Sequence, residues 1–407
     1  MKRDLTDRLF WLAKDEEVKK AEVTDHYFLN TELALHNSRV NPRVTMEVYT
    51  RHLPYSDGWG LLSGVYEVAK LLEGLPVDVD AMDEGEVFAV PHESLAYEPV
   101  MQIRGRYRDF ARYETPALGF LCSASGFATK AARIRVAAKD RVLLSFGTRR
   151  AHPALAPLIE RCAYMAGFDG VSNEAGAKLL GIEGSGTMPH SFILCYDTQQ
   201  EAWKAFASAL NPKEGVIALT DTLYDEKVES ILALETLGKK LSGIRLDTPS
   251  SRRGDWRKII EEVRWELNIR GGRDVKIFIS GGLDEDDIKQ YVDLVSGFGV
   301  GTSVSDAPSI DFNMKIVEVE KNGRMVPKAK RGDISGAKAL WRDEETMTDY
   351  LALEGSKQPQ NTTNLLKPLI RQGRIVREFE RIEEIRERVK ERLRTVASNP
   401  PKVRLLF

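Results

Sequence analysis

The sequence predicts an α/β protein, an irregular TIM-like α/β barrel with an N-terminal α+β domain to which the segment after the barrel returns. Short apolar runs alternate with amphipathic stretches of helical spacing through residues 115–305, and the runs end at intervals typical of βα units. Residues 1–114 instead mix short strands with helices and turns. The expected domains are therefore 1–114, the barrel with the active site at 115–305, and a return hairpin with a helical extension at 306–407. A doubly wound sheet is the alternative for the βα block.

The N-terminal domain carries three predicted strands, at residues 43–49, 86–90 and 100–104. After the barrel, residues 315–319 and 326–328 flank an Asn-Gly pair, which is typical of a β-hairpin. These runs predict that the end of the chain adds strands to the first domain.

The C-terminal extension is expected to contain a polar loop followed by one long helix. Residues 355–364 are rich in Ser, Gln, Asn and Thr, as in an exposed loop. The helix is predicted from an apolar stripe at Val376, Phe379, Ile382, Ile385, Val389 and Leu393. Its other face is densely charged, which favours packing on the body of the protein.

Within the barrel, the predicted strands are apolar throughout, as expected of parallel strands buried on both faces. They lie at residues 142–146, 216–220, 243–247 and 275–279. Helices are predicted at residues 225–240, 255–268 and 286–295. The carboxyl ends of such strands form the active-site face of an α/β barrel.

Charge and composition exclude several classes of protein. The 59 Lys and Arg residues against 61 Asp and Glu give a net charge of -2, without the basic excess of nucleic-acid-binding proteins. The longest charge-free run, residues 115–129, is too short to cross a membrane, and the first residues carry no apolar signal segment. We therefore expect a cytoplasmic protein. Its three cysteines are far apart and predict no zinc site, and no resident metal is expected.

Polar residues and glycines gather where five predicted strands end. The clusters are residues 146–150, 220–222, 245–248, 280–284 and 299–303. Glycine allows close approach of the backbone to an anion, so the clusters at 281–282 and 299–302 favour a phosphate site. A plain strand-to-helix turn is the alternative for either cluster alone.

Three further side chains are candidates for chemistry. Arg245 and Asp247 lie two residues apart on one strand and share a face, which suits an anionic, polyhydroxylated substrate. A mutual ion pair is the alternative. His190 follows a glycine-rich loop, residues 184–189, between two predicted strands; a histidine without a chemical role is the alternative there.

The order of these motifs resembles that of nicotinate phosphoribosyltransferase, most closely the short archaeal type. The motifs begin with Thr24-Asp25-His26-Tyr27 and continue through the clusters described above to residues 330–336. Each motif alone is unspecific, but seven in the same order cover nearly the whole chain.

The resemblance implies an enzyme of NAD biosynthesis that joins nicotinate to 5-phosphoribosyl 1-diphosphate, giving nicotinate mononucleotide and diphosphate. It also implies Mg2+ with the diphosphate substrate, ATP as a co-substrate, and a homodimer or higher homo-oligomer with shared active sites. Neither nucleic acid nor membrane is expected as a partner.

By the same resemblance, Phe146 and the Tyr27 of a neighbouring subunit sandwich the pyridine ring. Arg149 and Arg245 match arginines that contact the phosphoribosyl and pyridine substituents, and Asp247 matches the acidic residue at the ribose. These assignments place the two substrates at the strand ends.

The remaining implied residues concern phosphate groups. The glycine loops match the binders of the 5′-phosphate, and Thr148 and Thr187 lie within the matching motifs. The substrate-binding candidates of these segments are Thr148, Thr187, Gly281, Gly282, Gly301 and Thr302. His190 matches the histidine that ATP phosphorylates, and Asp221 matches the carboxylate that orients this histidine through its other ring nitrogen.

Two departures bear on the substrate. The nicotinamide branch carries an Asp in a Gly-Thr-Asp loop where this chain has Ser185-Gly186-Thr187, and losing that carboxylate favours an acid over an amide. Ser280-Gly281 stands where the amide branch has Gly-Asp. Quinolinate or nicotinamide phosphoribosyltransferase, and a non-catalytic binder of phosphoribosyl ligands, remain the alternatives.

Overall fold

The computed structural model describes residues 9–91, 94–209 and 215–407, and divides the chain into two compact units. The first unit comprises Met1–Gly126, Pro308–Arg381 and Thr395–Phe407, and the second comprises Phe127–Ala307 and Ile382–Arg394. A long helix, α5 (Glu114–Ala138), begins at the boundary expected after residue 114 and belongs to both units, which divide after Gly126. The expectation that no signal segment is present concerns residues 1–4, which lie outside the described residues.

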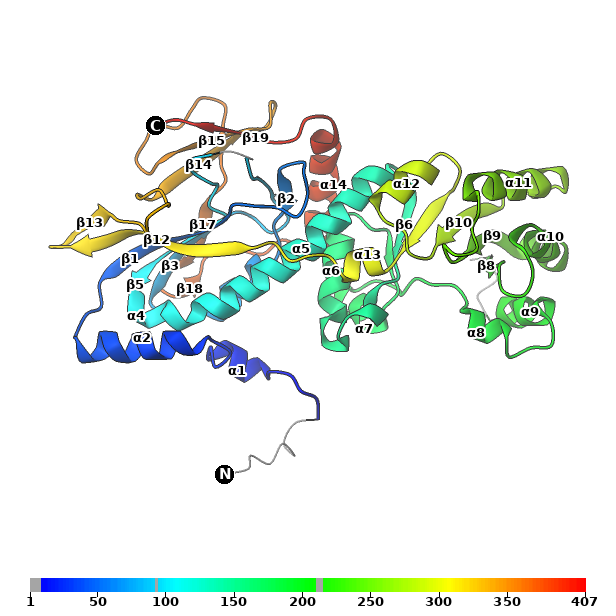
Figure 1. The fold of residues 1–407 in the computed structure, drawn as a ribbon, viewed down its shortest axis with the longest axis horizontal. Coiled ribbons are helices and arrows are strands. Elements are labelled where there is room, and N and C mark those ends of the chain that lie inside the picture. The colour runs from blue at the N-terminus through cyan, green and yellow to red at the C-terminus, as the bar shows by residue number, and fades with distance from the viewer. Residues whose placement is uncertain (1–8, 92–93, 210–214) are drawn as a thin grey trace. The chain divides into compact units, whose positions relative to one another are not determined.

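The first unit is built on an antiparallel sheet of seven strands in the order β13-β12-β1-β5-β3-β17-β18 (Figure 1). The strands are β1 (Arg43–Thr50), β3 (Val77–Ala81), β5 (Met101–Arg106), β12 (Phe312–Lys321), β13 (Arg324–Pro327), β17 (Lys367–Arg371) and β18 (Arg374–Ile375). β1 pairs with β12, with Val48 opposite Met314. The predicted return of the chain to its N-terminal domain is confirmed, as is the hairpin after the barrel.

A second, four-stranded sheet of this unit was not predicted. It has the order β16-β14-β15-β19 and contains β14 (Lys338–Asp343), β15 (Thr348–Leu353), β16 (Thr363–Asn364) and β19 (Lys402–Leu405). Its pattern is obscured in the sequence because two of its fully buried residues are charged, Arg342 and Asp349, which form an ion pair at 2.6 Å. A buried charge is tolerated when such a partner is present.

Smaller elements complete the first unit. They are α1 (Asp15–Lys19), α2 (His26–Asn37), β2 (Trp59–Leu61), α3 (Val65–Leu72), β4 (Val87–Ala89) and α4 (Tyr107–Phe110). One core joins the large sheet to α3, to the beginning of α5 and to β14 and β15. The last helix, α14 (Ile382–Ser398), belongs to the second unit as far as Arg394 and begins later than the predicted stripe. Phe379 precedes it and packs edge-on against Tyr66, with ring centroids 5.0 Å apart.

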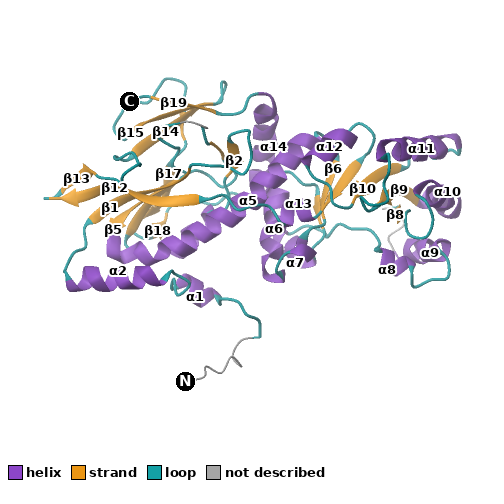
Figure 2. Cartoon of the chain, in the orientation of Figure 1, coloured by secondary structure: helices purple, strands orange, loops and turns teal. Residues whose placement is uncertain are grey.

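The second unit contains a curled, entirely parallel sheet of six strands in the order β7-β6-β11-β10-β9-β8 (Figure 2). The strands are β6 (Val142–Ser145), β7 (Gly170–Val171), β8 (Val216–Leu219), β9 (Leu241–Leu246), β10 (Lys276–Ser280) and β11 (Gly297–Val300). The first strand, β6, lies between the second and the last, as in a barrel. The sheet is open between β7 and β8, so the predicted TIM-like barrel is irregular, as expected.

The helices of this unit follow the strands in βα order. They are α6 (Ala156–Met165), α7 (Glu174–Leu180), α8 (His190–Ile193), α9 (Gln199–Ala209), α10 (Glu226–Leu237), α11 (Trp256–Ile269), α12 (Glu285–Tyr291) and α13 (Thr302–Ser305). Trp203 of α9 is fully buried, and its indole N–H donates to the carbonyl of Leu219 at 3.2 Å. No helix among the described residues is both long and apolar enough to span a membrane.

Candidate active site

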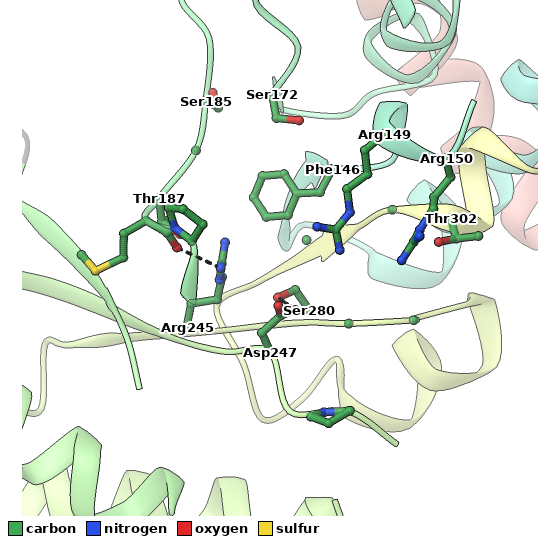
Figure 3. A pocket seen from close by; sticks show the side chains of 18 of the residues that line it. Phe146, Arg149, Arg150, Ser172, Ser185, Thr187, Arg245, Asp247, Ser280 and Thr302 are labelled. Atoms are coloured by element: carbon green, nitrogen blue, oxygen red, sulfur yellow. Dashed lines mark hydrogen bonds between the residues drawn. The ribbon is translucent and has the colours of Figure 1, made fainter. Parts of the chain in front are cut away.

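A cavity of about 660 Å³ lies at the carboxyl ends of the parallel strands of the second unit (Figure 3). Each strand end except that of β8 contributes at least one residue to its lining. The lining residues are Phe146, Arg149, Arg150, Ser172, Ser185, Gly186, Thr187, Met188, Pro189, Arg245, Asp247, Pro249, Ser250, Ser280, Gly281, Gly282, Gly299, Gly301 and Thr302. Their position agrees with the expectation that strand ends form the site.

The charge of this lining favours an anion. Three of the described lining residues are arginines, and one, Asp247, is acidic. Arg149 and Arg150 are exposed and come from a short 3-10 turn after β6, whereas Arg245 projects from β9. Burial lowers the pKa of Arg245, and the nearby carboxylate of Asp247 opposes that shift. A guanidinium remains charged under such conditions, so the cavity suits phosphate or carboxylate groups.

An aromatic ring forms part of the cavity wall. The Phe146 ring lies against Gly299, where an added Cβ would come within 2.4 Å of the ring. The Arg245 guanidinium carbon lies 5.7 Å from the centroid of the same ring. Gly299, a residue of β11, therefore makes room for the Phe146 ring, and it also lines the cavity.

The Gly281-Gly282 turn after β10 has a backbone that other residues adopt rarely. Both residues have positive φ, 93° and 69°. A Cβ at Gly281 would come within 3.1 Å of the carbonyl and carboxylate oxygens of Asp247. Arg253 also donates to the Gly281 carbonyl and lies over the Trp256 ring, 3.9 Å from its centroid. The turn is thus held close to Asp247, with its peptide groups at the cavity.

His190 begins α8 and lies between two carboxylates. Its Nε2 is 3.4 Å from Asp247 Oδ2, and its Nδ1 is 4.0 Å from Asp221 Oδ1. The hydroxyl of Thr222 is closer to Nδ1, at 3.1 Å. The resemblance assigned Asp221 to one of the ring nitrogens; in the structure Thr222 makes the hydrogen bond to Nδ1, and the Asp221 carboxylate is farther from this nitrogen.

The two carboxylates are held by different partners. Asp221 Oδ2 accepts from the backbone N–H of Asp247 at 2.6 Å, and its side chain is only 3% exposed. Asp247 Oδ1 accepts from the Ser280 hydroxyl at 2.6 Å. Asp247 therefore joins the histidine on one side to the end of β10 on the other. Arg245 donates to the Met188 carbonyl at 3.1 Å, so Arg245 and Asp247 have separate partners.

These contacts shift the pKa values of the group. The hydrogen bond to Asp247 raises the pKa of His190, against the effect of burial, and Asp221 adds to the increase. Burial acts to raise the pKa of Asp247, but hydrogen bonds from His190 and Ser280 lower it below its usual value. Burial raises the pKa of Asp221 to about 6. The histidine is thus favoured as a cation when both carboxylates are ionised.

The structure gathers most of the candidate residues but not all. Phe146, Arg149, Thr187, Arg245, Asp247, Gly281, Gly282, Gly301 and Thr302 line the cavity, and His190 contacts Asp247. Thr148 does not line it; its hydroxyl oxygen lies 3.5 Å from Asn173 Nδ2. Tyr27 belongs to the first unit, near the beginning of α2, and is 57% exposed.

Sequence reasoning missed several contributors. Thr222 lay inside a motif that the sequence identified, but the resemblance assigned the role beside the histidine to Asp221. Ser280 was identified in a strand-end cluster and as a departure from the amide branch, but without a role. Its bond to Asp247 depends on two neighbouring strands, which the linear sequence does not bring together. Among the described residues, no group of three His, Cys, Asp or Glu side chains is arranged to hold a metal ion.

Comparison with known families matches both parts of the chain to one enzyme. Residues 25–125 match the N-terminal domain of quinolinate phosphoribosyl transferase, and residues 127–315 match its C-terminal domain. Together these matches include every residue that lines the cavity.

Individual relatives are consistent with this match. The structure of a nicotinate-nucleotide pyrophosphorylase from Pyrococcus furiosus is 49% identical, has a TM-score of 0.90, and covers 95% of this chain and 98% of that one. A nicotinate phosphoribosyltransferase of Mycobacterium tuberculosis is 29% identical over 391 residues, 87% of this chain and 82% of the relative. Human nicotinic acid phosphoribosyltransferase, 19% identical, has a TM-score of 0.74 over 94% of this chain and 97% of that one, which supports the fold.

The contact between Asp247 and His190 generates a prediction that needs no substrate. In Asp247→Asn, the ring loses the carboxylate that stabilises its cationic form, so the pKa of His190 should fall. Titration of the imidazole 15N chemical shifts by NMR measures this change. The signals of His190 are assigned as those that disappear in His190→Gln. The same substitution at the exposed Asp286 should leave the titration unchanged. An unaltered pKa of His190 in Asp247→Asn would show that this contact is absent in solution.

Proposed function

The chain belongs to the nicotinate phosphoribosyltransferase family, with both domains of quinolinate phosphoribosyl transferase, and we propose that it transfers a phosphoribosyl group to nicotinate. The reaction joins nicotinate to 5-phosphoribosyl 1-diphosphate and releases nicotinate mononucleotide and diphosphate, a step of NAD biosynthesis. The observation that supports it most is the cavity itself, whose described lining combines three arginines, an aromatic ring and a glycine turn with one carboxylate.

The phosphoribosyl substrate carries anions at both ends, and the cavity offers two groups of anion binders. Arg149 and Arg150 suit the diphosphate, since guanidinium groups bind phosphate oxygens in pairs. The peptide N–H groups near Gly281 and Thr302 suit the 5′-phosphate. Asp247 lines the same cavity and is the carboxylate acceptor available there to the ribose hydroxyls.

Nicotinate needs a surface for its ring and a cation for its carboxylate. The Phe146 face offers the first, and Arg245, 5.7 Å from the ring centroid, offers the second. Stacking fixes the plane of the pyridine without occupying its nitrogen. The nitrogen is then free to attack C1 of the ribose.

Catalysis in this arrangement is mainly positioning and electrostatics. Loss of diphosphate from C1 develops positive charge on the sugar and negative charge on the leaving group. Arg149 and Arg150 would stabilise the leaving diphosphate, and Asp247 would stabilise the cationic sugar. Holding the ring nitrogen in line with the departing oxygen supplies much of the rate enhancement.

Magnesium would enter with the substrate. Because the described lining contains a single carboxylate, Asp247, most ligands of the ion would come from diphosphate oxygens and water. When bound, Mg2+ would neutralise charge on the diphosphate. The arginines perform the same task from the protein side.

ATP would act through His190. The ring lies between Asp247, which lines the cavity, and Asp221, which is almost fully buried, so Nε2 is the nitrogen on the cavity side. Attack of Nε2 on the γ-phosphorus forms a phosphorus–nitrogen bond and releases ADP. Hydrolysis of the phosphohistidine near the diphosphate would draw the transfer forward.

The active unit would be an oligomer with shared sites. Tyr27 lies in the first unit with its ring 57% exposed, near the beginning of α2. The backbone N–H and the carboxylate of Asp25, the residue before this helix, both bond the Thr115 hydroxyl. A fixed, exposed tyrosine of this kind is suited to cover the open face of a pyridine ring in another subunit.

The substrate prediction concerns the acid–amide choice. Purified protein should prefer nicotinate over nicotinamide by about 100-fold or more in kcat/KM, because Arg245 pairs with the carboxylate and the 185–187 loop carries no acid. Thr187→Asp should lower kcat/KM for nicotinate more than for nicotinamide, because the new carboxylate repels that of nicotinate. Thr187→Asn is its neutral control. Equal values for acid and amide, or turnover of quinolinate alone, would contradict the proposal.

The ATP prediction concerns His190. His190→Ala should abolish labelling by γ-labelled ATP and its hydrolysis, yet retain a slower, ATP-independent transfer, because other residues build the two substrate sites. Asp221→Asn should reduce labelling less completely. Acid-labile phosphate on the wild type is the direct measurement. Coupled ATP hydrolysis that survives in His190→Ala would refute this role.

The assembly prediction uses two inactive chains. If Tyr27 serves the neighbouring site, mixing Tyr27→Ala with Arg245→Ala chains should restore part of the activity, because each mixed dimer contains one intact site. Subunit exchange is confirmed separately by differently tagged chains. A mixture that exchanges subunits and stays inactive would rule out shared sites.

A further inference from the structure

A buried carboxylate outside the cavity holds the loop that faces His190. Glu229, in the first turn of α10, is fully buried. Its Oε2 accepts from the backbone N–H of Thr222 at 2.9 Å, and its Oε1 accepts from those of Leu223 and Tyr224 at 2.5 and 2.7 Å. Three consecutive peptide groups are therefore fixed by one side chain.

The first residue of that loop is the one that reaches His190. The Thr222 hydroxyl lies 3.1 Å from His190 Nδ1, closer than the carboxylate of Asp221 at 4.0 Å. The hydroxyl hydrogen can turn about the C–O bond, but the position of the oxygen depends on the backbone of Thr222. The backbone in turn depends on the bond to Glu229.

We propose that Glu229 and Thr222 form a positioning pair for His190, in which the Glu229 carboxylate fixes the Thr222 backbone and the Thr222 hydroxyl fixes the imidazole through Nδ1. Neither residue is expected to touch substrate. The inference deepens the phosphohistidine step and rests on the proposed function for its kinetic consequence.

The chemistry requires an acceptor at Nδ1. When Nε2 attacks the γ-phosphorus of ATP, its lone pair forms the new bond and the bond to the ADP oxygen breaks, so the remaining ring proton must lie on Nδ1. Asp247 competes for the proton, because its carboxylate lies 3.4 Å from Nε2 and would favour the opposite tautomer. An oxygen held beside Nδ1 stabilises the reactive form.

The other groups near the ring are Asp221, Asp247 and Arg245. The two carboxylates favour the cation and Arg245 disfavours it. Thr222 differs from all three, because its hydroxyl is neutral and can accept from Nδ1 or donate to it. Its contribution can therefore be removed without altering the charge around His190.

The experiment compares four single variants by γ-labelled ATP and by the imidazole 15N titration of His190. Thr222→Val removes the hydroxyl at nearly constant shape, and Thr222→Ser keeps it. Glu229→Gln keeps the size of the side chain but replaces one acceptor oxygen with an NH2 group. Since Oε1 accepts two bonds and Oε2 one, the amide should place its NH2 against Thr222. Glu235→Gln, exposed on the same helix, is the matched control.

Labelling of Thr222→Val and Glu229→Gln should slow by about tenfold or more, with Thr222→Ser and Glu235→Gln close to wild type. The His190 titration should move to lower pH in the two slow variants, since the cation loses an acceptor at Nδ1. The double variant that combines Thr222→Val with Glu229→Gln should be labelled no more slowly than Thr222→Val alone, because Glu229 acts through Thr222.

Three results would overturn the pair. The first is a His190 titration and a labelling rate in Glu229→Gln that equal those of the wild type. The second is a loss of labelling rate in the double variant that equals the sum of the two single losses. The third is a labelling rate in Thr222→Ser that is as low as in Thr222→Val. Thermal melting identifies a variant that has lost its fold, and the two Thr222 variants then decide the outcome. If the wild type takes no label from ATP, the proposed ATP step fails, whereas the titrations still test the positioning.

Discussion

The candidate chemistry depends on one geometric constraint, that parallel strands bring their carboxyl ends to the same edge of a sheet. Phe146 follows β6, Asp247 follows β9, and Ser280 ends β10, so residues more than a hundred positions apart line one cavity. The strands are short and buried on both faces, which fixes their register through packing. The 184–189 loop and His190 lie on the connection between β7 and β8, the two edge strands of this sheet.

Asp247 is the point at which the parts of the site meet. One of its oxygens accepts from Ser280, the other faces His190, and its backbone N–H donates to Asp221. Under the proposed function, this carboxylate would serve the ribose and the histidine together. The contacts on either side of the histidine site therefore share one residue, Asp247.

The sequence predicted what depends on local pattern. Apolar runs located β6, β8, β9 and β10 within a few residues, and the Asn-Gly pair located the hairpin of β12 and β13. The prediction failed where charged residues are buried, as in the sheet that contains Arg342 and Asp349. A charged residue is expected to be exposed unless its partner is known. The close approach of Gly299 to the Phe146 ring could not be predicted for another reason, since the ring follows a different strand.

The candidate site shows the same division. Strand-end clusters contain eight of the nine candidate residues that line the cavity, because these clusters lie where apolar runs end, and the ninth, Thr187, lies in the glycine-rich loop. Contacts that join separate elements, such as Thr222 with His190 or Ser280 with Asp247, could not be read from spacing. The resemblance to a family supplied roles for residues, whereas the structure supplied the partners that hold them in place.

A crystal structure with nicotinate and 5-phosphoribosyl 1-diphosphate tests the central claim most directly. The account predicts the diphosphate against Arg149 and Arg150, the 5′-phosphate at the Gly281-Gly282 turn, and the pyridine ring on Phe146 with its carboxylate toward Arg245. Substrates bound elsewhere, or a pyridine ring away from Phe146, would contradict it.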